Sequence, residues 1–281
     1  MIVLFAILVV LAGASTLLYY IIGHQRYGKG VPAGLLQLGV NEGTLSDKAL
    51  RPEPCRTVRV YFIKPSRYDE EGYVQFFRYG VQPNNTLTVL RALNETFNRH
   101  YSAQRNVYLE TVIWDEICDG VVSPATIDAI KEKAAEDGVE LFIGLAGVQS
   151  NQYPRGRDLA LQFVAEGLPT MMGGFHVSGF PDSVKFLNEC GITTVVGEAE
   201  NIWGDIIEDF LRGDLRRNYS VTVGIRAKTG QEDIIVPLIT ESLLPVLDDR
   251  YLTRFFNDTM TTLDTSRGCP FTCSYCSVKN V

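Results

Sequence analysis

The fold is decided by the stretch Leu141-Phe142-Ile143-Gly144-Leu145-Ala146, which is apolar without interruption. A strand with one solvent-exposed face alternates apolar and polar residues. A strand of a parallel sheet that is covered by helices on both faces does not alternate. The stretch therefore predicts a buried strand at the centre of a parallel sheet.

Strand and helix patterns alternate on both sides of this stretch. Further strands are predicted at residues 58–63, 107–114, 168–172 and 193–196. The segments that follow the strands carry apolar residues at helical spacing, and Ser123-Pro124 supplies an N-cap and a first-turn proline. The pattern predicts an α/β fold, with a doubly wound, flavodoxin-like or Rossmann-like parallel sheet of five strands and right-handed crossovers.

Such a sheet binds ligands beyond the carboxyl ends of its strands. Segments from each strand end should meet at that edge because parallel strands all end on the same side. These segments are Lys64–Arg67, Asp115–Asp119, Gly147–Ser150, Gly173–Ser178 and Gly197–Glu200.

Composition indicates a globular protein and gives no sign of nucleic-acid binding. The chain of 281 residues is 46% hydrophobic and 21% charged, with a net charge of −7 and no basic stripe. No nucleic-acid partner is therefore expected.

The N-terminus carries a long apolar run, Ile2–Ile22, with no charged residue. Its length as a helix, about 31 Å, is enough to cross the hydrocarbon core of a bilayer. Basic residues follow the run, at Arg26 and Lys29, and none precedes it. We expect a single-pass membrane anchor over residues 1–23, with the N-terminus outside and the rest cytoplasmic. A cleavable signal peptide, a misassigned start site and a buried helix are the alternatives.

Three cysteines are clustered near the end of the chain, as Cys269-x3-Cys273-x2-Cys276. Thiolates at this spacing can bind one small inorganic centre from a single loop. Structural zinc requires a fourth ligand, and the last histidine of the chain is His176. On spacing alone, an iron–sulfur cluster, zinc and accidental clustering all remain open.

The flanks of these cysteines resemble the cluster loop of radical S-adenosylmethionine (SAM) enzymes. The resemblance lies in the Ser-Arg-Gly-Cys-Pro lead-in and in an aromatic residue before the last cysteine, within Asp264-Thr265-Ser266-Arg267-Gly268-Cys269-Pro270-Phe271-Thr272-Cys273-Ser274-Tyr275-Cys276. It implies a [4Fe-4S] cluster held by the three cysteines, SAM bound to the open iron, and Tyr275 near the adenine. It also implies reductive cleavage of SAM to a 5′-deoxyadenosyl radical, with an electron donor such as flavodoxin or ferredoxin. The substrate stays unknown.

The upstream region resembles the cobalamin-binding-type domain that often precedes a radical SAM barrel. The resemblance lies in residues 144–150, 173–176 and 195–200. It implies that Ser150, Gly173 and Gly174 line the nucleotide-tail side of a corrinoid. His176, which follows the Gly-Gly turn, is a candidate ligand contact or a loop histidine bonded to local backbone.

One departure from that pattern concerns the lower ligand of cobalt. Domains that ligate cobalt from below carry an Asp-x-His-x-x-Gly motif after the first strand, where this chain has Lys64-Pro65-Ser66-Arg67. The similar spacing in Asp115–Gly120 follows the second strand and has Ile117 at the histidine position, so we interpret it as a coincidence. Cobalamin would then bind without this ligand, or the domain has kept the fold without the cofactor.

The expected organisation is an anchor (1–23), a juxtamembrane linker (24–55), a cobalamin-binding-type domain (56–220), a connector (221–262) and the start of a radical SAM domain (263–281). A radical SAM barrel needs about 200 further residues, so we expect no turnover by this chain alone. Two other functions stay open. One is a corrinoid- or ligand-binding module with a vestigial cluster loop, and the other is a zinc-stabilised, membrane-tethered interaction protein.

Overall fold

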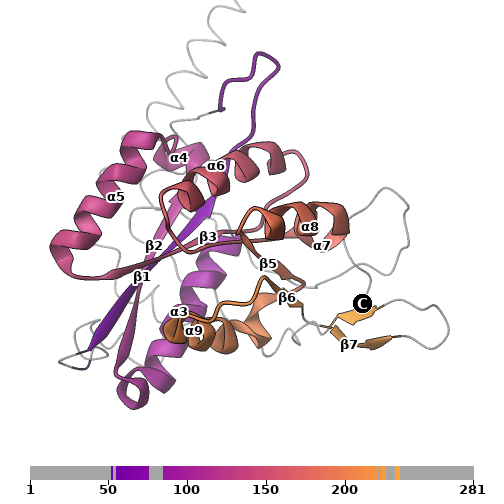
Figure 1. Cartoon of the computed structure of the whole chain (residues 1–281). Coiled ribbons are helices and arrows are strands. Elements are labelled where there is room, and N and C mark those ends of the chain that lie inside the picture. Colours follow the sequence, from indigo (N-terminus) through magenta and orange to yellow (C-terminus); the bar gives the residue numbers. More distant parts are fainter. Residues whose placement is uncertain (1–51, 53–54, 76–84, 221, 226–231, 235–281) are drawn as a thin grey trace, which may run out of the picture. The chain divides into compact units, whose positions relative to one another are not determined.

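Six parallel strands form the central sheet of the computed structural model, in the order β2-β1-β3-β4-β5-β6 (Figure 1). The structure describes residues 52, 55–75, 85–220, 222–225 and 232–234. The strands are β1 (Arg56–Lys64), β2 (Val107–Asp115), β3 (Glu140–Leu145), β4 (Thr170–Gly173), β5 (Thr193–Val196), β6 (Asn218–Ser220), β7 (Thr222–Ile225) and β8 (Glu232–Ile234). The helices are α3 (Asn85–Arg105), α4 (Glu116–Asp119), α5 (Pro124–Asp137), α6 (Tyr153–Ala165), α7 (Phe175–Gly179), α8 (Pro181–Glu189), the 3-10 helix η2 (Ala199–Asn201) and α9 (Trp203–Arg212).

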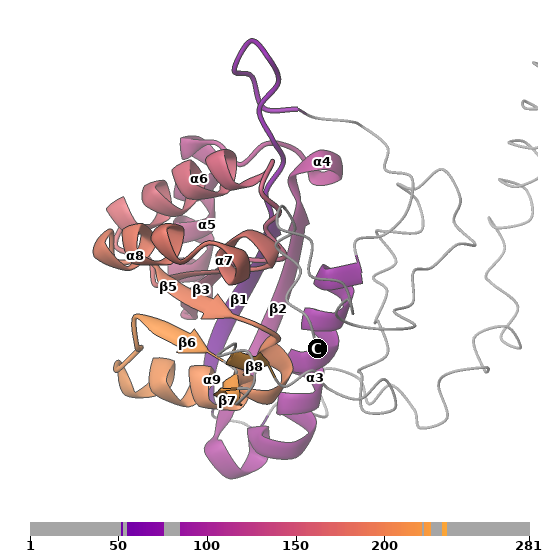
Figure 2. The same ribbon diagram turned by 90° about the vertical axis from the view of Figure 1, so that its right-hand side faces the viewer.

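Helices cover both faces of the sheet (Figure 2). On one face, α3 and α9 pack against side chains such as Val60 and Phe62 of β1. On the other face, α5, α6 and α8 pack against the alternate side chains, such as Tyr61 and Ile63. Successive side chains of a strand point to opposite faces, and both sets are buried here. This explains the uninterrupted apolar stretch of β3 and confirms the α/β fold with a parallel sheet.

The sheet has six strands rather than the predicted five. The additional strand, β6, pairs in parallel with β5 and contains one buried apolar residue, Tyr219. Its hydroxyl donates to Asp209 of α9 at 2.8 Å, which holds the strand against the helix. A strand of three residues with one apolar side chain is too short to produce a recognisable alternation, so the sequence pattern missed it.

The crossover connection from β5 to β6 has a different handedness from the crossover between β3 and β4. It runs in the same direction along the sheet as the crossover from β3 to β4, but α9 lies on the opposite face from α6. The two crossovers therefore have opposite hands. Right-handed crossovers were predicted for the connections among β1 to β5, and the exception involves β6, the strand that was not predicted. Aromatic packing accounts for the exception, because Trp203 and Phe210 of α9 stack on Phe142 of β3, with ring centroids 6.3 and 4.6 Å apart.

The predicted start of the helix at Ser123-Pro124 is confirmed. Ser123 caps α5 by accepting a hydrogen bond from the Thr126 backbone N–H, and the Thr126 hydroxyl accepts one from the Ser123 backbone N–H. These reciprocal bonds satisfy N–H groups that have no partner within the helix. The apolar residues at helical spacing in this segment, Ile127, Ile130 and Ala134, are buried.

A buried amide links three elements on the face covered by α3 and α9. The Asn94 side chain of α3 donates to the Thr111 hydroxyl of β2 at 2.9 Å. Its carbonyl oxygen accepts from the indole N–H of Trp203 in α9, also at 2.9 Å. Asn94 is fully buried, so these bonds satisfy polar atoms that have no access to water.

The two remaining strands, β7 and β8, form an antiparallel pair. They lie within the predicted connector, residues 221–262. Among the residues that the structure describes, no helix is long and apolar enough to cross a membrane. The predicted anchor, residues 1–23, lies outside them.

Candidate functional site

The carboxyl ends of the parallel strands bring several sequence-predicted site residues to one edge of the sheet. Ser150 follows β3, while Gly173, Gly174 and His176 lie at the end of β4 and in α7. The two loops are tied together, because the Val148 N–H donates to the Gly173 carbonyl and the His176 N–H donates to the Val148 carbonyl, each at 3.0 Å. The structure thus brings together all four residues predicted for the corrinoid side.

Gly174 is required by the close approach of these loops. Its φ of +126° is unfavourable for residues with a side chain, and a Cβ there would lie 2.2 Å from the Val148 nitrogen. At Gly173 an added Cβ would meet Val195 at an ordinary 3.4 Å. The sequence analysis predicted that both glycines line the nucleotide-tail side of a bound corrinoid. The structure gives Gly174 a different reason, contact between two loops of the protein itself.

His176 is held on every side. Its ring stacks between Tyr153 of α6 and Phe180, with ring centroids 3.9 and 4.6 Å away. Its Nδ1 lies 3.2 Å from the Ser150 hydroxyl and its Nε2 lies 2.9 Å from the Ser183 hydroxyl. The side chain therefore bonds two hydroxyl groups rather than local backbone. Burial lowers the pKa of His176, which favours a neutral ring at physiological pH.

The surroundings of this histidine fit a large ligand with polar and apolar parts. Ser150 is exposed, and Gly173 and Gly174 are half-buried. Phe175 and Phe180 expose 48% and 43% of their surface. Phe180 stacks on His176, the residue that bonds the Ser150 hydroxyl. Sites for organic ligands combine mostly apolar lining with a few placed polar groups. This part of the edge is compatible with the nucleotide side of a corrinoid.

The end of β1 offers no histidine to a cobalt ion. Lys64 and Ser66 are almost fully buried, and the Ser66 hydroxyl donates to the Gln75 carbonyl at 2.6 Å. The Asp115–Gly120 spacing also has a local explanation, because Asp115 caps α4 by accepting from the Ile117 N–H. The interpretation of that spacing as a coincidence agrees with these contacts.

Two buried charged residues end the neighbouring strands β1 and β2. Lys64 and Asp115 are partners in the strand register, and each exposes 6% of its surface. The Lys64 ammonium donates to the carbonyl of Gly147 after β3. It thus spans β1 and β3, the point at which the strand order reverses. Burial lowers the pKa of Lys64 to about 8 and raises that of Asp115 to about 6.

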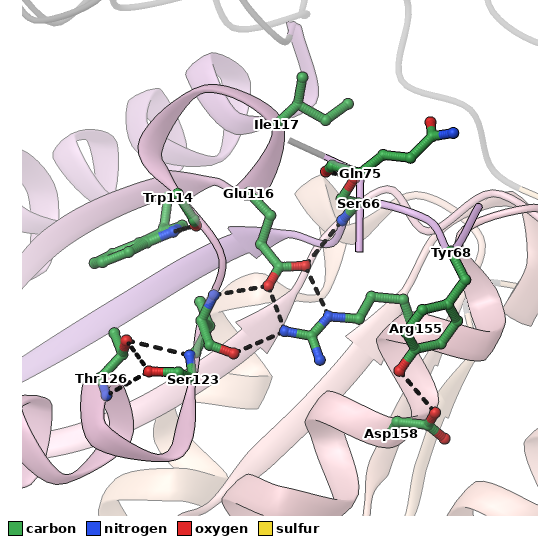
Figure 3. A network of polar contacts seen from close by, with 12 residues as sticks. Ser66, Tyr68, Gln75, Trp114, Glu116, Ile117, Ser123, Thr126, Arg155 and Asp158 are labelled. Carbon is green, nitrogen blue, oxygen red and sulfur yellow. Dashed lines mark hydrogen bonds and ion pairs between the residues drawn. The ribbon is translucent and has the colours of Figure 1, made fainter. Parts of the chain in front are cut away.

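A buried ion pair next to these residues was missed by the sequence argument (Figure 3). Glu116 accepts two bonds from Arg155 of α6, at 2.6 and 3.1 Å. It also accepts from the backbone N–H groups of Ser66 and Val122, at 3.0 and 2.9 Å. The side chains expose 0% and 6% of their surface, so the pair is desolvated. The two residues lie 39 positions apart, and no local pattern could have paired them.

The cluster residues Cys269, Cys273, Cys276 and Tyr275 lie outside the described residues. Within the described part of the chain, no group of three or more His, Cys, Asp or Glu residues could hold a metal ion. The proposed ligands of the iron–sulfur cluster therefore stay a prediction from sequence.

Comparison with known proteins finds one distant relative. The chain is 26% identical over 149 residues to the bacteriochlorophyllide d C-8(2)-methyltransferase of Chlorobaculum tepidum. The match covers 53% of this chain and 30% of that protein, so the chain spans less than a third of its relative. No family model matches the chain. No solved structure matches it either.

Proposed function

We propose that this chain belongs to a radical SAM enzyme of the methyl-transferring kind, with residues 56–220 as its cobalamin-binding-type domain. Three independent features support the proposal. The cluster-loop sequence 264–276 supplies the cysteines, the distant relative is a methyltransferase by name, and the sheet brings Ser150, Gly174 and His176 together at its carboxyl edge. The cluster-loop sequence is the observation that carries the proposal.

The roles of the cluster-loop residues follow from their chemistry. Cys269, Cys273 and Cys276 would hold a [4Fe-4S] cluster by their thiolates, and Tyr275 would lie against the adenine of SAM. When bound, the cluster supplies one electron to SAM, delivered by a donor such as flavodoxin or ferredoxin. The substrate is left open by the residues at hand.

The role of the sheet domain is to bind and orient a corrinoid at its carboxyl edge. The exposed Ser150 hydroxyl would bond the nucleotide tail, and the Gly173-Gly174 turn would lie along it. Phe175 and Phe180 would exclude water from the adjoining apolar surface. With Lys64 and Ser66 buried at the end of β1, we propose that no side chain of that strand end replaces the tail on cobalt.

Anaerobic reconstitution of the purified full chain with iron and sulfide tests the cluster. We expect about four irons per chain and absorbance at roughly 400 nm. Alanine at Cys269, Cys273 or Cys276 should abolish both signals, whereas the half-buried Cys190→Ala variant is the matched control and should retain them. Stoichiometric zinc without iron would replace this proposal by the zinc-stabilised alternative.

Titration of the same chain with hydroxocobalamin tests the corrinoid part separately. We expect a saturable change in the cobalamin spectrum. Corrinoid binding without iron incorporation would favour a binding module with a vestigial cluster loop. Iron incorporation without corrinoid binding would mean that the domain has kept the fold alone.

We also propose that residues 1–23 anchor the chain in a membrane, with the following domains cytoplasmic. The uncharged apolar run Ile2–Ile22 and the basic residues after it support this. The full chain should sediment with membranes and resist extraction by carbonate, and deletion of residues 1–23 should release it. Release of the full chain by carbonate would contradict the anchor.

A further inference from the structure

The His176 ring cannot turn in its place. Tyr153 and Phe180 cover its two faces at 3.9 and 4.6 Å between ring centroids. Its backbone N–H is bonded to Val148, and the residue exposes only 9% of its surface. A side chain locked by packing can hold a second side chain in a defined orientation.

Both ring nitrogens are engaged by serine hydroxyls from different elements. Ser150 lies in the loop after β3, and Ser183 lies in the first turn of α8. A neutral imidazole has one N–H donor and one acceptor nitrogen. One serine hydroxyl must therefore donate to the ring while the other accepts from it, so the orientations of the two hydroxyls are coupled through His176.

Ser150 and His176 differ in their exposure to solvent. Ser150 is exposed at the carboxyl edge, whereas His176 is buried behind it and has no free ring nitrogen. A serine hydroxyl can donate one hydrogen bond and accept two. After one bond to the ring, the Ser150 hydroxyl can therefore still bond a ligand. A hydroxyl fixed in advance also loses less entropy on binding.

We propose that His176 is a positioning residue, which holds the Ser150 hydroxyl toward the nucleotide tail of a bound corrinoid and is itself held by Ser183. This inference rests on the proposed corrinoid-binding function and deepens it. It assigns recognition of the tail to the Ser183–His176–Ser150 chain rather than to direct contact between His176 and the ligand.

Titration with two ligands tests this inference separately from the proposed corrinoid-binding function. Hydroxocobalamin carries the nucleotide tail, and hydroxocobinamide is the corrin without it. In titrations of the full chain, His176→Phe keeps an aromatic ring in the stack but removes both bonds. We expect it to weaken cobalamin binding about three- to tenfold, the effect of one hydrogen bond, and to leave cobinamide binding unchanged. Ser150→Ala should behave in the same way.

Conservative variants and a double-mutant cycle distinguish a positioning role of His176 from a merely structural one. The amide of His176→Asn can take the place of Nδ1 and should recover most of the preference for cobalamin, whereas His176→Gln reaches toward Ser183 and should not. His176→Phe in a Ser150→Ala background should cause no further loss. Ser183→Ala, which touches no ligand, should reduce the preference partly and serves if His176→Phe fails to fold.

The outcomes are distinguishable. Equal weakening of both ligands by His176→Phe, or additive losses in the double variant, would overturn this inference and leave the proposed function intact. A wild-type chain that binds neither corrinoid would overturn both.

Discussion

At the scale of single residues, Gly174 is a position at which a side chain is poorly tolerated. Alanine there would combine a φ of +126° with a Cβ 2.2 Å from the Val148 nitrogen. We expect Gly174→Ala to lower the free energy of unfolding by about 3 kcal/mol or more, measured by urea denaturation. Gly173→Ala is the matched control, because its Cβ would meet only ordinary contacts. Equal stability of the two variants would contradict the assigned loop contact.

Asp115 and Lys64 give stability a defined dependence on pH. Burial raises the pKa of Asp115 to about 6, so its protonated form is favoured in the folded state. The stabilisation from this group is present at low pH and is lost as the pH rises from about 4 through about 6. Asp115→Asn cannot ionise, so the stability of the wild type relative to this variant should fall across that interval.

Lys64 should shift this transition. Its positive charge lowers the pKa of Asp115, against the larger effect of burial. We therefore expect Lys64→Met to move the Asp115 transition to higher pH, as followed by urea denaturation at a series of pH values. An unchanged transition would mean that the two strand-end charges do not interact.

Some residues of the candidate site could be predicted from the sequence and others could not. The Gly173-Gly174 turn, Ser150 and His176 were found because they follow strands in a recognisable pattern. The roles of Tyr153 and Ser183 were not, since packing of α6 and α8 brings their side chains to His176. Contacts made by tertiary packing leave no periodic signal in the chain.

At the scale of elements, the Glu116–Arg155 pair connects the end of β2 with α6 and with the loops after β1 and before α5. Glu116→Gln would leave the Arg155 charge buried without its counter-ion. We expect a loss of about 3–5 kcal/mol in the free energy of unfolding, measured by chemical denaturation. Lys131→Ala removes the exposed pair with Glu166 and should leave the denaturation midpoint unchanged.

A double variant distinguishes the loss of the charge pairing from the loss of the hydrogen bonds that Glu116 accepts from the backbone. In Glu116→Leu with Arg155→Met both charges are removed, so most of the stability lost in the single variant should return. If the double variant were as unstable as Glu116→Gln, the backbone bonds to Glu116 rather than its charge pairing would account for its importance.

Elements with a strong local signal were the ones that the sequence predicted. Ser123-Pro124 marked the start of α5, and segments rich in apolar and β-branched residues marked β1 to β5. The short elements α4, α7 and β6 were missed, because four, five and three residues carry too little periodicity. Each depends on its neighbours: β6 pairs with β5 and bonds to α9 through Tyr219.

At the scale of the whole molecule, the proposed cluster and corrinoid sites use different parts of the sequence. We expect a triple alanine variant of Cys269, Cys273 and Cys276 to lose iron while keeping the cobalamin spectrum and the thermal unfolding of the sheet domain. His176→Phe should show the reverse, with iron retained and cobalamin weakened. Loss of corrinoid binding in the triple cysteine variant would indicate that the two sites depend on each other.

The architecture was largely predictable, because the alternation of strands and helices restricts the topology to a few arrangements. The crossover of opposite hand between β5 and β6 was not predictable. It depends on the packing of the aromatic side chains of α9 against Phe142, on the face of the sheet that α3 also covers. This preference is visible only in the packed structure.

The buried amide of Asn94 has a consequence for where this chain can mature. Asn94-Glu95-Thr96 is an acceptor sequence for N-linked glycans. In the fold the Asn94 nitrogen bonds to Thr111 and its oxygen to Trp203, with no surface exposed. A sugar could be attached only to the unfolded chain, and it would then keep α9 and β2 away from α3. Natively folded protein from a secretory expression system should therefore show an unmodified Asn94 by mass spectrometry, and any fraction glycosylated at Asn94 should be unfolded.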